Sequence, residues 1–87
     1  MNTFSLIIAS PDGDLFRGEV AALFLRGAEG DLAVLAGHTP FVTTVQPCVC
    51  RIELPDGTVR TADAPGGLLS VSAEATRLLS GGFRFRE

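Results

Sequence analysis

The sequence predicts a single all-β domain, an antiparallel sandwich or flattened barrel built from short strands. Apolar or alternating segments recur along the chain, and turns rich in glycine, proline and aspartate separate them at intervals of about six to twelve residues. No segment alternates strands with a long helix, which argues against an α/β fold. The 87 residues, 46% of them hydrophobic, suffice for one domain over residues 1–87 with one modest core.

Turn chemistry and apolar runs define the first half of the chain. Residues 10–13 form a turn signal, because Pro11 presets its own φ, Asp12 can cap the turn and Gly13 can take a positive φ. A short apolar segment follows this turn and is interrupted at residues 17–19. The strands expected in this half are residues 3–9, 15–16, 20–25, 32–35 and 41–45.

The clearest alternation lies at residues 48–54, where every second side chain is apolar. The turn at residues 55–57 should reverse the chain into an antiparallel partner at 58–62, with Arg60 near Arg51 or Glu53. Residues 73–79 have some helix propensity but span only two turns without a convincing cap. After a glycine-rich corner at 63–67, we therefore expect two last strands, at residues 68–72 and 77–80.

Charge and cysteine usage limit the function classes. The net charge is −3 and all seven basic residues are scattered arginines, which argues against nucleic-acid binding. No run of about 18 apolar residues is present, and the N-terminus shows no secretory signal. Cys48 and Cys50 would point to one side of a strand, about 7 Å apart, too far for an unstrained disulfide. They are most simply core-lining side chains in a protein of a reducing compartment.

Residues 27–41 are the segment most typical of a functional loop region, with three glycines and the only histidine. His38, Glu29 and Asp31 could form a metal or acid–base cluster; His38 could also bind its neighbouring backbone or contact a partner. No serine lies in a nucleophile elbow, no second histidine can act as a base, and the glycines lack the residues of a phosphate loop. The residues alone indicate a small β module that binds something.

Four motifs stand in register over about sixty residues. Residues 10–20 resemble (T/S)P-x-G-x-x-(F/Y)-x-G-x-V, and residues 27–31 resemble G-x-E-G-(E/D). Residues 37–41 look like G-H-x-P-(L/F), and residues 66–71 look like G-G-(F/I)-(L/V)-x-V. Together they resemble the N-terminal β-sandwich domain of the F-type ATP synthase epsilon subunit, which is called delta in mitochondria.

The resemblance implies a ten-stranded antiparallel β-sandwich of two five-stranded sheets. It also implies a non-catalytic rotor subunit at the foot of the central stalk, which couples proton-driven rotation to ATP synthesis. Ser10, His38 and Thr43 would contact the gamma subunit, and Glu29 and Asp31 would meet the arginine-bearing loops of the c ring. No cofactor, metal or small-molecule substrate is expected, and the subunit would be peripheral, on the cytoplasmic side of the bacterial inner membrane. The alternative is a free-standing ligand- or metal-binding β module.

The sequence departs from the family pattern in two ways. Ala33, Ala36 and Cys48 replace a glycine, a proline and a glycine that the family usually has, which affects the backbone around the central loop. The sequence also ends at Glu87, before the two-helix hairpin that most members carry and that inhibits ATP hydrolysis. The sequence leaves two interpretations: a short subunit that couples rotation without this hairpin, or the first part of a longer subunit.

Overall fold

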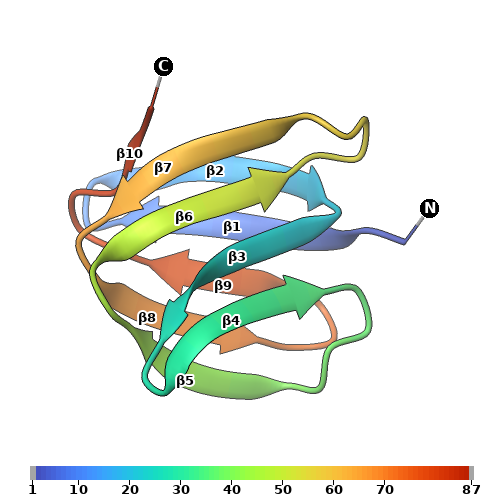
Figure 1. Ribbon diagram of the computed structural model, residues 1–87, viewed down its shortest axis with the longest axis horizontal. Coiled ribbons are helices and arrows are strands. Elements are labelled where there is room, and N and C mark those ends of the chain that lie inside the picture. The colour runs from blue at the N-terminus through green and yellow to red at the C-terminus, as the bar shows by residue number, and fades with distance from the viewer. Residues whose placement is uncertain (1, 87) are drawn as a thin grey trace.

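A computed structural model of the chain describes residues 2–86, and ten β-strands make up the secondary structure of this part (Figure 1). The strands are β1 Phe4–Ser10, β2 Gly13–Val20, β3 Ala22–Gly27, β4 Gly30–Leu35, β5 Phe41–Val45, β6 Cys48–Glu53, β7 Val59–Ala64, β8 Gly67–Val71, β9 Thr76–Leu79 and β10 Arg84–Phe85. The all-β class predicted from the sequence is confirmed. No helix within residues 2–86 has the length and hydrophobicity that crossing a membrane requires.

All ten strands belong to one curled sheet in the order β10-β7-β6-β3-β5-β8-β9-β1-β2, with β4 paired to β3 beside this path (Figure 1). β3 and β5 are joined only by the pair Gly27 and Val45. Five strands lie on each side of that bridge, so the two expected five-stranded sheets are two halves of one sheet. The first and last strands of this order approach each other. The ring centres of Phe16 on β2 and Phe85 on β10 are 6.1 Å apart. The result is a flattened barrel.

One pairing differs from the predicted antiparallel arrangement. β1 and β9 pair in parallel, with Leu6 opposite Thr76 and Ala9 opposite Leu79. Every other pairing within residues 2–86 is antiparallel. Local turn signals could not reveal this contact, because the two strands are far apart in the sequence.

The core lies inside the curl and receives side chains from both halves of the sheet. In β6 the predicted alternation is confirmed: Cys50 and Ile52 are fully buried, whereas Val49 and Arg51 are exposed. Burying an aliphatic side chain such as that of Ile52 stabilises a fold by about 1.5–3 kcal/mol. The largest fully buried side chains are Leu6, Ile8, Leu23, Ile52, Leu69, Leu78, Val20, Val34 and Cys50.

Two local expectations are wrong. β2 continues through residues 17–19 without a break, because its pairing with β1 extends from Gly13 to Val20 and overrides the local polarity. Arg60 lies opposite Ile52, whereas Thr61 lies opposite Arg51 and Val59 opposite Glu53, so the expected cross-strand pairing of Arg60 does not form. Its guanidinium carbon instead lies 3.8 Å from the centre of the Phe85 ring.

Candidate functional site

The turn between β3 and β4 carries the first predicted site residue. Gly27 pairs with Gly30 across this hairpin, which leaves Ala28 and Glu29 as a two-residue turn. Gly30 has a φ of 123°, a conformation that L-residues rarely adopt. Glu29 is exposed at the tip of the turn. The glycines therefore fix a tight turn that presents its carboxylate to solvent.

Two side chains hold this turn in place, one from Thr43 in β5 and one from Gln46 directly after β5. The side-chain Nε2 atom of Gln46 donates hydrogen bonds to the carbonyl oxygens of Gly27 at 2.9 Å and Ala28 at 3.3 Å. The backbone N–H of Ala28 donates to the hydroxyl of Thr43 at 3.3 Å. The backbone N–H of Gln46 donates to the carbonyl oxygen of Arg26 at 2.9 Å. Glu29 thus projects from a turn that the neighbouring strand clamps.

Asp31 lies directly opposite Arg26 at the start of β4. The Arg26 Nε atom is 3.2 Å from Asp31 Oδ1, and the Asp31 side chain is 86% exposed. An exposed pair of this kind contributes about 0–1 kcal/mol, so Asp31 remains free to exchange partners at little cost. Glu29 and Asp31 together place two accessible carboxylates at one corner of the molecule.

Three of the five predicted site residues lie around one shallow hollow. Glu29, Asp31 and Thr43 line a hollow of about 350 Å³ between the β3–β4 turn and the first half of β5, with Phe41 and Val42 on its other side. The structure therefore brings the two carboxylates next to the hydroxyl that holds their turn.

His38 lies elsewhere, in the β4–β5 connection. Its Nδ1 atom is 2.8 Å from the carbonyl oxygen of Thr39, its backbone N–H donates to the carbonyl oxygen of Leu35 at 3.2 Å, and its ring centre is 4.8 Å from that of Phe41. The six residues of β4 separate it from the β3–β4 turn, about 20 Å along the strand. His38 and Glu29 consequently cannot share a ligand shell. Within residues 2–86, no group of three or more His, Cys, Asp or Glu side chains is arranged to hold a metal ion.

Ser10 lies at the same end of the sheet as the β3–β4 turn but several strands away. Its hydroxyl accepts a hydrogen bond from the Asp12 N–H at 3.2 Å and donates to the carbonyl oxygen of Gly13 at 3.3 Å. β5, β8 and β9 intervene between β3 and β1, which corresponds to about 19 Å at the usual strand spacing. Ser10, His38 and Thr43 are thus three separate points on the surface.

The two cysteines are both free, as expected, and act in packing. Burial, together with the neighbouring Cys48 thiol, raises the pKa of the Cys50 thiol to about 12, so Cys50 stays protonated at neutral pH. Cys48 is half-buried, and its Sγ atom accepts a hydrogen bond from the Arg26 N–H at 3.4 Å. Gln46 is the site residue that the sequence did not reveal, since its only local signal is the following Pro47, which marks the end of a strand.

Comparisons with known proteins find a family model and relatives that match most of the chain. The family model for the ATP synthase delta/epsilon chain β-sandwich domain matches residues 3–83. The chain is 34% identical over 80 residues to the ATP synthase epsilon chains of Psychrobacter sp. strain PRwf-1 and Psychrobacter cryohalolentis. Each match covers 92% of this chain and 58% of the relative, so the chain spans little more than half the length of these relatives.

Two solved assemblies contain chains of the same fold. A chain in the mitochondrial ATP synthase OSCP/F1/c-ring structure of Euglena gracilis superposes with a TM-score of 0.90 at 23% identity, over 98% of this chain and 54% of that one. A chain in the central stalk/c-ring structure of Tetrahymena thermophila mitochondrial ATP synthase gives 0.73 at 11% identity, over 91% and 63%. At these identities the likeness shows the fold alone.

Proposed function

The chain belongs to the ATP synthase delta/epsilon chain β-sandwich family, and on this premise we propose that it is a non-catalytic rotor subunit of an F-type ATP synthase. It binds at the central stalk between the gamma subunit and the c ring. There it couples proton-driven rotation to ATP synthesis, as a peripheral protein on the cytoplasmic side of the bacterial inner membrane. The observation that carries the proposal is the clamped β3–β4 turn, which presents its carboxylates at one corner of a domain of this family.

The c ring is the proposed partner of Glu29 and Asp31. Carboxylates pair well with guanidinium groups, and the exposed arginines of the c-ring loops would supply them. Asp31 can release Arg26 to make such a contact because their present pair is exposed. The bonds from Gln46 and Thr43 hold the turn beforehand, which reduces the entropy lost on binding.

The gamma subunit is the proposed partner of Ser10, His38 and Thr43. Since these residues are distributed over both ends of the sheet, the contact would extend along the length of the domain. The outer surface of β5, β8 and β9 supports this proposal with exposed apolar side chains: Val42 is 64%, Leu68 41% and Leu79 51% exposed. Exposed ion pairs are too weak to hold a rotor subunit, so apolar packing on gamma should supply most of the affinity.

Association with gamma tests the proposal. The purified chain should be retained by the immobilised cognate gamma subunit at micromolar concentration or below, and the variant V42D should be retained less. T58D, altered in the β6–β7 turn, serves as a control for the added charge. No association of the wild-type chain with gamma, alone or on the c ring, would contradict the proposed function.

A further inference from the structure

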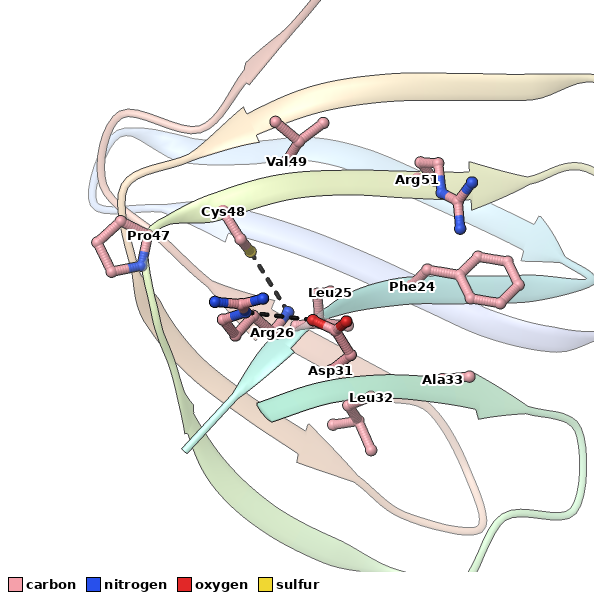
Figure 2. A pocket seen from close by; sticks show the side chains of 10 residues that line it. All are labelled: Phe24, Leu25, Arg26, Asp31, Leu32, Ala33, Pro47, Cys48, Val49 and Arg51. Atoms are coloured by element: carbon pink, nitrogen blue, oxygen red, sulfur yellow. Dashed lines mark hydrogen bonds and ion pairs between the residues drawn. The ribbon is translucent and has the colours of Figure 1, made fainter. Parts of the chain in front are cut away.

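A second hollow lies on the outer surface of β3, β4 and β6, away from the core (Figure 2). It has a volume of about 580 Å³. In β3 the alternation that buries Leu23 and Leu25 turns Phe24 and Arg26 outward into this hollow. Arg51 reaches it from β6, where it lies opposite Phe24 in the sheet register. The hollow therefore contains two guanidinium groups and an aromatic ring on one sheet surface.

Arg51 is held in place but not neutralised. Its guanidinium carbon lies 5.0 Å from the centre of the Phe24 ring, a cation–π distance, and Figure 2 shows the group directed into the hollow. Within residues 2–86 no carboxylate forms an ion pair with Arg51, and its side chain donates no hydrogen bond to the protein. The ring orients the guanidinium while its five N–H donors remain available.

Arg26 is only partly used. Its Nε atom bonds to Asp31, and its two terminal nitrogens make no hydrogen bond to any residue of the described chain. Arg26 lies two residues from Phe24 on the same side of β3, so the two guanidinium groups line one hollow. The site offers more cationic donors than the single carboxylate of Asp31 satisfies.

Exposed apolar side chains lie beside this hollow, together with the charged side chains of Asp31 and Asp63. Val49 is 46% exposed and lines it, and Leu35 and Val59, at 53% and 56%, face outward from the neighbouring strands β4 and β7. Exposed apolar side chains that lie close together mark protein–protein contacts, and the residues that contribute most to the affinity of such contacts are often arginines. A free small anion would leave this apolar surface in water, whereas a protein would cover it.

We propose that the hollow of Phe24, Arg26 and Arg51 is a docking site for an aspartate or glutamate side chain that a protein partner in the rotor presents among apolar residues. This inference rests on the proposed function and extends it. The carboxylate pairs with Arg51 in the bidentate geometry that guanidinium favours, and Arg26 adds a second donor. The apolar neighbours of the carboxylate pack on Val49 and the Phe24 ring.

The absence of lysine from this sequence makes a selective test possible. In R51K the only side-chain amine lies at the proposed contact. The cognate synthase lacking this subunit is reconstituted with R51K and treated with a carbodiimide, which joins an amine and a carboxylate in direct contact by an amide bond. R60K is the matched control, because Arg60 also lies over a phenylalanine ring but on β7 beside Phe85.

We expect R51K to form a covalent adduct through an aspartate or glutamate of a partner subunit, identified by mass spectrometry, and R60K to form none. R51E should bind the depleted synthase at least tenfold more weakly than the wild type, and R60E should bind unchanged. Circular dichroism and thermal unfolding verify that each variant folds. If the wild type assembles but R51K gives no adduct and R51E binds normally, this inference is overturned. If the wild type itself does not assemble, the proposed function fails instead.

Discussion

The Thr43 hydroxyl accepts a hydrogen bond from the backbone N–H of Ala28 at 3.3 Å, which ties β5 to the turn that carries Glu29. The family resemblance implies different partners for Thr43 and Glu29, yet the two residues lie around one hollow. Hydrogen bonds to Thr43 and from Gln46 therefore join the segments of the two proposed contacts.

Gln46 should be the residue that stabilises this turn most. Q46A removes the donor to Gly27 and Ala28, and we expect the free energy of unfolding to fall by about 1–2 kcal/mol. Q46E should be at least as destabilising, because a carboxylate oxygen would face two carbonyl oxygens. Urea denaturation measures both, with T44A at an exposed neighbour as control. Equal stability of all four proteins would contradict this assignment.

The charge of Asp31 should matter for coupling and little for folding. Because its pair with Arg26 is exposed, D31R should change the free energy of unfolding by no more than about 1 kcal/mol. The same variant should lower ATP-driven proton pumping of the reconstituted synthase severalfold, since it repels the c-ring arginines. D56R, in the β6–β7 turn, which contains none of the proposed contact residues, is the control. Pumping that responds equally to both variants would contradict the assignment of Asp31.

Steric and backbone constraints require glycine at residues 66 and 67. A Cβ atom on Gly67 would overlap the carbonyl oxygen of Leu79, and Gly66 has a φ of 127°. We expect G67A to lower the free energy of unfolding by more than about 2 kcal/mol, because the β8–β9 pairing must shift. For G81A, whose Cβ would have Pro11 as its nearest neighbour at 3.8 Å, we expect a much smaller change. Thermal unfolding of the two variants distinguishes them, and equal melting temperatures would refute this explanation.

The ion pair between Asp63 and Arg86, beside the C-terminal strand, should be lost in acid. The Arg86 side chain donates to both Asp63 oxygens and holds the pKa of that carboxyl below its ordinary value. A lowered folded-state pKa gives stability that is present above the unfolded-state pKa, near 4, and is lost as the pH falls through the folded value. Carboxyl ¹³C shifts should show Asp63 titrating at lower pH in the wild type than in R86Q. Identical titration of Asp63 in the wild type and R86Q would exclude its pairing with Arg86 as the cause of the lowered pKa.

The two thiols should differ in reactivity. Because burial raises the pKa of Cys50 to about 12, iodoacetamide at pH 8 should leave Cys50 unmodified in the folded protein. Cys48, which is half-buried and lines the second hollow, should be alkylated first. Peptide mass spectrometry after timed labelling measures the fraction of each cysteine that is alkylated, with protein in 8 M urea as the unfolded control. Comparable labelling of the two folded-state thiols would contradict the packing described here.

Local chemistry in the sequence predicted much of the fold. Gly57 takes a positive φ after Pro55 and Asp56, and the alternation in β6 separates buried Ile52 from exposed Arg51. Both signals depend on residues near each other in the chain, so they can be recognised without a structure. The all-β class and most strand positions followed from signals of this kind.

Long-range features could not be predicted in the same way. The position of Arg60 depends on the register between β6 and β7, which places it opposite Ile52. The role of Gln46 depends on the approach of β5 to the β3–β4 turn. The resemblance supplied candidate residues, but only the sheet geometry shows which of them share a surface.

Hydrogen–deuterium exchange of the chain, free and assembled into its cognate synthase, tests the central claim most directly. Two segments should gain protection on assembly: the β3–β4 turn at residues 27–31 and the segment at 38–43 that contains His38 and Thr43. The turn at residues 54–58, which contains none of the proposed contact residues, should exchange at the same rate in both states. Unchanged exchange at 27–31 and 38–43, with protection confined to other surfaces, would contradict the account.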